Sequence, residues 1–220
     1  MVKALIFDLD DTLYYEMTYV RGALKEVSKY LSRKYEVNSE KLYKKSLEIL
    51  KKDGRGKIFN ELCKIYSISE EISILVEIYR ESKPKLKLYE DSIKIIEYAK
   101  KNNIKTGIIT DGNSKVQWNK IYSLGLDKLI DKIIVTDDYG PGYSKPHEKA
   151  YTEITRIFNL KFEECMYIGD NPSKDFVGAI SLGMQTRRIV REKGDHTHDI
   201  ANKGYDAHSK INSLNDIFYR

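Results

Sequence analysis

Two acidic residues that stand two positions apart, Asp8 and Asp10, follow a short apolar run near the N-terminus. A carboxylate at the end of a strand can attack phosphorus and form an aspartyl-phosphate, which divides one difficult displacement into two easier steps. A second carboxylate two residues later can protonate the leaving group and then deprotonate the attacking water. These duties require environments that separate the two pKa values. A metal site or an acidic turn after a strand explains the segment equally well.

A second candidate segment, Thr110 to Asn113, ends another apolar run. The Thr110 hydroxyl, the permissive backbone of Gly112 and exposed amides at a helix start can hold phosphate oxygens. The alternative is an ordinary strand-to-helix turn capped by Asp or Asn.

A lysine and two further acids complete the set of candidates. Lys145 lies between Ser144 and Pro146, and its ammonium can offset the repulsion between a carboxylate and a phosphate. Asp170 offers the hard oxygen that Mg²⁺ prefers, and Asp175 can support it from behind. Read alone, Lys145 is typical of a surface residue, and the two acids are typical of a helix cap and a surface charge.

Apolar runs and helical patterns alternate around these segments. Runs typical of buried strands cover residues 3–9, 104–110, 132–136, 165–169 and 185–190, with helical periodicity between them. This alternation predicts an α/β fold with a Rossmann-like parallel sheet. Reactive groups gather outside the carboxyl ends of such strands, so we expect the candidate residues at one edge of the sheet.

Residues 15–85 break this alternation. Apolar residues recur there at helical intervals in four groups and predict a small all-helical subdomain inserted after the first strand. The predicted domains are therefore a catalytic core, residues 1–14 and 86–220, and a helical insert, residues 15–85.

Together, the candidate segments resemble the four motifs of the haloacid dehalogenase superfamily of hydrolases. The matching residues are Asp8, Asp10 and Thr12 for motif one, Thr110 for motif two, Lys145 for motif three, and Gly169, Asp170 and Asp175 for motif four. The resemblance covers nearly the whole chain and likens the helical insert to the family's first-type cap. Only 34 residues lie between Thr110 and Lys145, which disfavours a large second-type cap there.

The resemblance implies a magnesium-dependent phosphatase in which Asp8 is the nucleophile and Asp10 the acid and base. It implies Mg²⁺ bound by the Asp8 side chain, the Asp10 backbone carbonyl and the Asp170 carboxylate. Thr110 and Lys145 would contact the phosphoryl oxygens, helped by backbone amides near Leu9, Asp111 and Gly112. The residues expected to support this site from behind are Asp175, Asn171 and Thr12.

Other chemistries of related proteins fit less well. The dehalogenases that name the superfamily lack the second acid, so Asp10 argues for phosphate transfer. Transport ATPases of the superfamily carry a lysine at that position and are far longer. Phosphomutases resemble phosphatases closely and remain an alternative. A phospho-accepting receiver module uses similar groups but has about the length of one small domain. It also carries its acid on a middle strand, and the helical insert disfavours it.

The expected substrate is a small phosphorylated metabolite, such as a sugar phosphate, a phosphoglycolate-like acid, an acyl-sugar phosphate or a nucleotide. Arg55, flanked by glycines between predicted helices, and Tyr14 are candidates for substrate specificity. An exposed loop and a packed hinge are the respective alternatives. Residues 195–199 contain two histidines and two aspartates, but their spacing favours a solvated loop beyond the last predicted strand.

Bulk composition narrows the class of protein. The 220 residues are 41% hydrophobic and 32% charged, and no stretch approaches the roughly 20 apolar residues of a membrane span. The net charge of +5 is spread along the chain, so neither a nucleic-acid nor a membrane partner is expected. Cys63 and Cys165 lie in apolar contexts typical of reduced thiols, and no signal peptide is evident. We expect a cytoplasmic monomer or homodimer.

Overall fold

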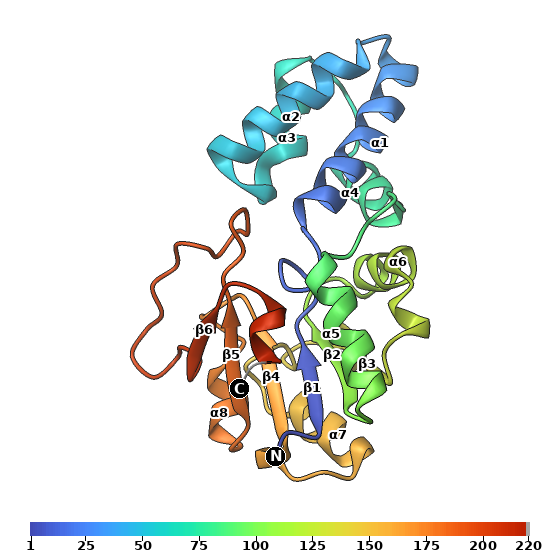
Figure 1. Cartoon of the computed structure of the whole chain (residues 1–220). Helices are drawn as coiled ribbons and strands as arrows, with labels where there is room; N and C mark the ends of the chain where they lie inside the picture. Colours follow the sequence, from blue (N-terminus) through green and yellow to red (C-terminus); the bar gives the residue numbers. More distant parts are fainter. Residues whose placement is uncertain (219–220) are drawn as a thin grey trace. The chain divides into compact units, whose positions relative to one another are not determined.

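A parallel sheet forms the centre of the computed structural model, which describes residues 1–218 (Figure 1). Within that range, six strands form one sheet in the order β3-β2-β1-β4-β5-β6, and every neighbouring pair is parallel. The strands are β1 (Ala4–Phe7), β2 (Lys105–Thr110), β3 (Lys132–Val135), β4 (Cys165–Gly169), β5 (Gln185–Ile189) and β6 (Ser209–Ile211). The predicted Rossmann-like parallel α/β fold is confirmed.

The central strands are apolar because helices cover the sheet. β1 and β4 are buried along their full length and show no polar alternation, which is typical of parallel sheets. The longer helices of this unit are α5 (Glu90–Lys101), α6 (Ser114–Leu124), α7 (Lys149–Phe158) and α8 (Val177–Ser181). Short 3₁₀ helices are η2 (Leu126–Lys128), η3 (Thr136–Tyr139), η4 (Phe162–Glu164) and η5 (Leu214–Ile217).

One apolar core lies between the sheet and helices α7 and α8, with Ile6, Tyr151 and Phe176 fully buried in it. Gly107 in β2 explains how closely α7 approaches this strand. A Cβ at this position would lie 2.4 Å from the Ile154 Cδ1 atom of α7. The absence of a side chain at Gly107 therefore permits α7 to pack closely against β2.

The five predicted strands agree with the observed ones to within two residues at each end, but β6 was not predicted. It has three residues, of which Ile211 is buried, and it pairs with β5 through Ile189 and Ile211. A strand of three residues is too short to show a periodic pattern of apolar residues in the sequence. It is recognised as a strand only by its pairing with β5. Residues 195–199, which follow the last predicted strand, therefore lie between β5 and β6.

The segment Met17–Lys85 forms a second compact unit, separate from the unit made of Met1–Glu16 and the chain from Leu86 onward. Its helices are α1 (Met17–Tyr35), α2 (Ser39–Asp53), η1 (Arg55–Lys57), α3 (Ile58–Ile65) and α4 (Ile72–Glu81). They enclose their own core, which includes Leu24, Leu42, Leu62 and Leu75. The unit begins two residues later than the predicted insert, and its role as a cap remains a prediction.

The two ends of the insertion lie side by side in the sheet-containing unit. The Tyr89 amide donates a hydrogen bond to the Leu13 carbonyl at 3.0 Å, and Tyr14 pairs with Leu88 in an isolated bridge. The chain therefore leaves and re-enters the sheet-containing unit at one place, so the insertion does not interrupt the packing of that unit.

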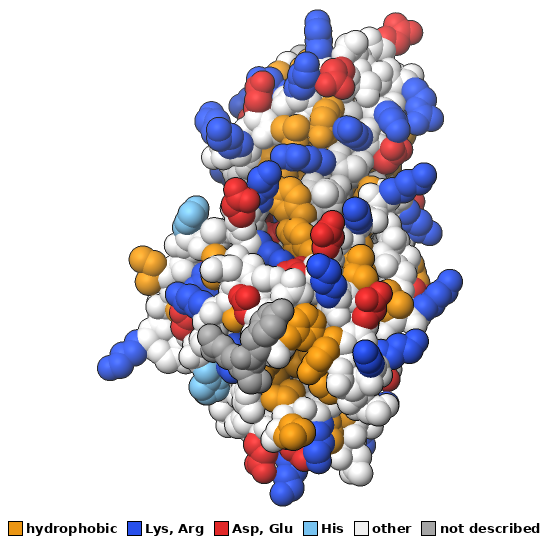
Figure 2. All heavy atoms as spheres, in the orientation of Figure 1, with side chains coloured by type: hydrophobic (Ala, Val, Ile, Leu, Met, Phe, Trp, Pro, Cys, Tyr) orange, Lys and Arg blue, Asp and Glu red, His pale blue; other side chains and the backbone are white. Residues whose placement is uncertain are grey.

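Basic and acidic side chains are interspersed over the face drawn in Figure 2. No described helix combines the length and apolar character that crossing a membrane requires.

Candidate active site

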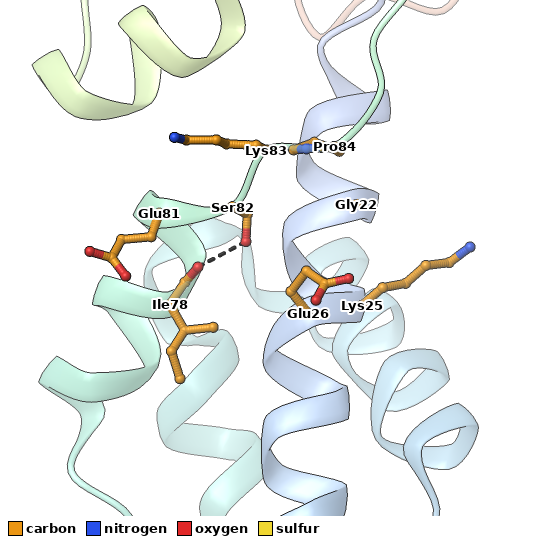
Figure 3. A pocket seen from close by; sticks show the side chains of 8 residues that line it. All are labelled: Gly22, Lys25, Glu26, Ile78, Glu81, Ser82, Lys83 and Pro84. Atoms are coloured by element: carbon orange, nitrogen blue, oxygen red, sulfur yellow. Dashed lines mark hydrogen bonds between the residues drawn. The ribbon is translucent and has the colours of Figure 1, made fainter. Parts of the chain in front are cut away.

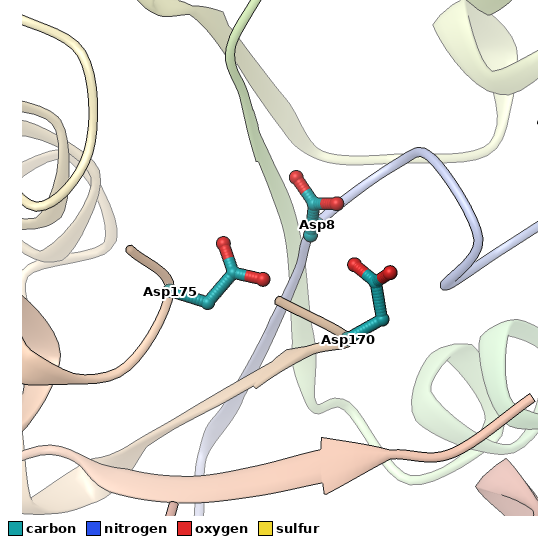
Figure 4. Close-up of side chains that lie close together, drawn as sticks. All are labelled: Asp8, Asp170 and Asp175. Carbon is teal, nitrogen blue, oxygen red and sulfur yellow. The ribbon is translucent and has the colours of Figure 1, made fainter. Parts of the chain in front are cut away.

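The strand ends bring the predicted acids to one edge of the sheet. Asp8 follows β1, Thr110 ends β2 and Asp170 follows β4. Because β1 lies between β2 and β4 and all three run parallel, their carboxyl ends meet at this edge. Figure 4 shows the side chains of Asp8, Asp170 and Asp175 directed toward a common space.

Lys145 connects two of these acids. Its Nζ donates to Asp8 Oδ1 at 2.5 Å, to Asp175 Oδ1 at 2.7 Å and to the Tyr167 hydroxyl at 3.1 Å. Burial acts to lower the pKa of Lys145, but the charges of Asp175 and Asp8 outweigh it and raise the pKa well above the ordinary value. The lysine therefore remains a cation beside the Asp8 carboxylate, where a phosphate dianion would otherwise be repelled.

Three buried carboxylates, Asp8, Asp170 and Asp175, have ligand atoms within 4.8 Å of one another. Burial raises the pKa of Asp8 to about 7, with Asp175 adding to the effect and Lys145 opposing it. Burial, followed by the charges of Asp8 and Asp175, raises the pKa of Asp170 well above the ordinary value. The cluster thus holds more negative charge than Lys145 neutralises. Hard oxygens with excess negative charge fit a divalent cation such as Mg²⁺.

Asp175 differs from the other two acids because both of its oxygens are engaged. Oδ1 accepts from Lys145, and Oδ2 accepts from the Asn171 amide at 2.9 Å. A Cβ on Gly169 would lie 2.4 Å from Asp175 Oδ2, so the glycine leaves the room that this carboxylate occupies. Asp175 therefore anchors Lys145 and the turn after β4, and its supporting role in catalysis remains a prediction.

Asp10 is held by three side chains. Lys120 Nζ donates to both of its oxygens, at 2.7 and 2.8 Å, the Tyr14 hydroxyl donates to Oδ1 at 2.6 Å, and Gln117 Nε2 donates to Oδ2 at 2.9 Å. Burial acts to raise the pKa of Asp10, but the Lys120 charge and these hydrogen bonds outweigh it and lower the pKa. Asp8 and Asp10 therefore occupy environments that shift their pKa values in opposite directions.

Lys120 and Gln117 were not predicted from the sequence. Both lie on α6, three positions apart, and therefore on one face of the helix. The only available signal was this spacing on the helix that follows Thr110, and the same spacing is common on solvated faces. Tyr14, a specificity candidate, is fully buried with its hydroxyl on Asp10. A direct contact with substrate would require that packing to change.

The turn after β2 is fixed by side-chain contacts. The Thr110 hydroxyl lies 2.5 Å from Gln117 Nε2. Asp111 Oδ1 accepts from the Thr136 hydroxyl at 2.7 Å and from the Lys145 amide at 3.1 Å. Gly112 has a φ of +120°, a conformation that favours glycine. The Asp111 carboxylate thus holds the backbone at Lys145 in place. Asp111 would therefore contact a phosphate through its backbone amide and not through its side chain.

Thr12 and Asn171, which are predicted to support the site, have contacts that the sequence did not indicate. Thr12 is buried, and its carbonyl accepts from Arg191 Nη2 at 2.6 Å. Asn171 Nδ2 lies 2.9 Å from His196 Nε2, and Arg188 Nη2 donates to the His196 carbonyl at 2.8 Å. Residues 195–199 form a loop in which Asp195, His198 and Asp199 are exposed, as the sequence predicted. His196 is partly buried, because Asn171 and Arg188 contact it.

The remaining specificity candidate, Arg55, is exposed in η1 of the helical unit. Its role in specificity remains a prediction. A separate groove in the same unit is drawn in Figure 3 and contains none of the predicted site residues. The residues that line it are Gly22, Lys25, Glu26, Ile78, Glu81, Ser82, Lys83 and Pro84.

Comparisons with known proteins identify relatives over nearly the whole chain. Residues 5–189 match the family model described as haloacid dehalogenase-like hydrolase. A protein named glyceraldehyde 3-phosphate phosphatase from Methanocaldococcus jannaschii is 31% identical over 99% of this chain and 96% of its own. A protein of the same name from Methanopyrus kandleri is 30% identical over 88% of this chain and 86% of its own.

A solved structure agrees with this relationship. The structure of a HAD phosphatase from Thermococcus onnurineus is 28% identical, with a TM-score of 0.63, and the match covers 98% of this chain and 96% of that one. The resemblance inferred from the four sequence motifs is thereby confirmed.

Proposed function

The chain belongs to the haloacid dehalogenase-like hydrolases, and we propose that Asp8 is the nucleophile with which it hydrolyses a small phosphomonoester. Its enzyme class is that of a phosphatase, as in the relatives it matches. The observation that carries the proposal is the position of Asp8 at the end of β1, where Lys145 contacts one of its oxygens and Asp170 faces it.

In the first step, an Asp8 oxygen attacks phosphorus, and the bond between phosphorus and the leaving oxygen breaks. Lys145 stabilises the charge on the transferred group, and Thr110 with the amides of Asp111 and Gly112 binds its oxygens. Asp10 supplies the proton that the departing oxygen takes up.

In the second step, water attacks the aspartyl-phosphate on Asp8. Asp10 accepts the proton of this water, inorganic phosphate departs and the Asp8 carboxylate is restored. Asp10 in this structure accepts hydrogen bonds at both oxygens, which is the ionised form that this step requires.

Asp8, Asp170 and the Asp10 backbone carbonyl would hold the metal. Bound Mg²⁺ would offset the charge of the facing carboxylates and of the phosphoryl oxygens. The excess negative charge of the Asp8–Asp170–Asp175 cluster supports this assignment.

The substrate class that we propose is a three-carbon phosphate such as glyceraldehyde 3-phosphate. Two relatives with at least 30% identity over most of both chains carry that name, which also favours hydrolysis over phosphomutase chemistry. Arg55 remains the candidate that would tune this choice from the helical unit. We also propose a cytoplasmic location and a monomer or homodimer.

Phosphate release from a panel of phosphorylated metabolites, with and without Mg²⁺, tests this function. We expect activity with Mg²⁺, loss of activity in EDTA, and the highest kcat/KM for three-carbon phosphates. Asp8→Asn should lower kcat by a factor of about 10⁴ or more, because the nucleophile is lost.

Three results would contradict separate parts of this proposal. Retained turnover in Asp8→Asn would exclude Asp8 as the nucleophile. Full activity in EDTA would exclude the metal. A higher kcat/KM for another class of phosphate would exclude the proposed substrate.

A further inference from the structure

Helix α6 carries two buried polar residues on the face toward the sheet. Gln117 and Lys120 are 1% and 3% exposed. Burial of a primary amide and an ammonium costs free energy unless both are hydrogen-bonded. Their partners therefore show what this face of the helix is built to hold.

The partners belong to two different parts of the candidate site. Gln117 Nε2 lies 2.9 Å from Asp10 Oδ2 and 2.5 Å from the Thr110 hydroxyl. Lys120 Nζ reaches both oxygens of Asp10 and, at 3.4 Å, Glu16 Oε1. One helix thus connects the acid after β1 to the hydroxyl at the end of β2.

The start of α6 makes this connection rigid. Asn113 caps the helix by accepting from the Val116 amide at 3.4 Å, directly after the turn at Gly112. A Cβ on Gly112 would lie 3.4 Å from the Gln117 side chain, so the turn packs against the same amide. The position of Gln117 is therefore set by the strand that ends at Thr110.

We propose that Lys120 and Gln117 are positioning residues that hold the Asp10 carboxylate, in register with Thr110, as the proton acceptor for the second step. This inference rests on the proposed function. Three donors on one carboxylate fix the plane of the group. Because their four hydrogen bonds occupy both lone pairs of each Asp10 oxygen, one donor must release its oxygen before Asp10 accepts the proton of the attacking water. Neither residue contacts the transferred phosphoryl group in this role.

p-Nitrophenyl phosphate separates the two steps. Its leaving group departs without a proton donor, so with this substrate Asp10 matters mainly for hydrolysis of the aspartyl-phosphate. We expect Lys120→Met to lower kcat about tenfold or more, because it would forfeit part of the roughly 10²–10⁴-fold contribution of an aligned general base. KM should fall in parallel, and a burst of p-nitrophenol stoichiometric with enzyme should precede the slow steady state. Gln117→Leu should act in the same direction.

A double mutant tests whether Lys120 acts through Asp10. In an Asp10→Asn background, adding Lys120→Met should change kcat by less than about twofold, because residues that act as a unit are not additive. Lys94→Met removes an exposed lysine from α5 and should keep wild-type kinetics. If Lys120→Met does not yield folded protein, Gln117→Leu carries the same test.

The inference would be overturned if Lys120→Met lowered kcat and kcat/KM equally without a burst. Additive effects in the Asp10→Asn background would also overturn it. Failure of the wild-type protein to release phosphate from any phosphomonoester would instead refute the proposed function, so the two failures are distinguishable.

Discussion

Asp170 and Asp175 carry the same functional group, five residues apart, but their surroundings differ. Asp175 is fully buried and accepts from Lys145 and from the Asn171 amide. Asp170 faces the charges of Asp8 and Asp175, which together with burial raise its pKa well above the ordinary value. At the scale of single residues, one carboxylate therefore stabilises the folded chain, and the other is held where its charge is unfavourable without a cation.

Asparagine substitutions at these two positions should have opposite effects on stability. In EDTA at neutral pH, Asp170→Asn should raise the melting temperature, because the raised pKa of Asp170 makes burial of this carboxyl costly, whereas asparagine is neutral in the folded and the unfolded chain. Asp175→Asn should lower the free energy of unfolding by about 3 kcal/mol, as expected when a buried ion pair loses one partner.

Thermal unfolding with and without Mg²⁺ measures both effects. Mg²⁺ should stabilise the wild-type protein and should not stabilise Asp170→Asn. If metal-free Asp170→Asn is less stable than metal-free wild type, Asp170 is not a metal ligand in a cluster with excess negative charge.

At the scale of elements, a buried arginine orders the long connection between β5 and β6. Arg188 is 1% exposed, and its Nη2 donates to the carbonyls of His196 and Asp199 at 2.8 and 2.9 Å. The Asp195 amide donates to Asp11 Oδ2 at 2.9 Å. These contacts hold His196 beside Asn171, so an irregular segment forms part of the wall of the candidate site.

Replacement of Arg188 by methionine should release this connection while the sheet stays folded. Methionine keeps much of the apolar stem but donates no hydrogen bond. The free energy of unfolding should fall by about 2 kcal/mol, as for lost hydrogen bonds to a charged group.

Limited digestion with trypsin should then cut faster after Arg191, Lys193 and Lys203. Lys105→Met, at an exposed residue of β2, provides the control. Equal digestion rates in the Arg188→Met and wild-type proteins would show that Arg188 does not hold this segment.

At the scale of the whole sheet-containing unit, one ion pair joins segments far apart in the chain. Arg191 Nη1 donates to Asp91 Oδ2 at 2.7 Å, and Asp91 also accepts from the Leu214 amide at 2.9 Å and the Ser213 hydroxyl at 3.0 Å. Arg191 donates in addition to the Thr12 carbonyl. The pair thus ties α5 to the segment after β5, to η5 and to the segment after β1.

This ion pair predicts a pH dependence of stability. Burial acts to raise the pKa of Asp91, but the Arg191 and Leu214 hydrogen bonds outweigh it and hold the pKa below its ordinary value. Because the unfolded chain binds the proton more readily, the contribution is present above the ordinary pKa and is lost as pH falls through the lowered pKa.

Chemical denaturation between pH 7 and pH 3 should therefore show a loss of stability at the acid end that is smaller in Asp91→Asn. Asp127→Asn, in the short helix η2, serves as a control because no comparable ion pair binds this residue in the described structure. Identical acid profiles for Asp91→Asn and wild type would show that the Asp91–Arg191 pair does not cause the pH dependence of stability.

The sequence by itself determined the α/β class, five strands and the grouping of Asp8, Thr110, Lys145 and Asp170. Local signals were sufficient because a buried parallel strand is a continuous apolar run and the residue that follows it must emerge at the common edge. The family followed from those same residues.

Only the tertiary structure decided how Asp10 is held, what fixes His196 and where β6 pairs. Lys120 reaches Asp10 across 110 positions of the chain, and Arg191 reaches Thr12 across 179. Such partners leave no local pattern, because a lysine on a buried face of a helix and one on a solvated face have the same spacing. The acid and base duties of Asp10 were therefore inferred from sequence, whereas the side chains that contact it emerged only when α6 packed beside β3, close to Asp10 after β1 and Thr110 at the end of β2.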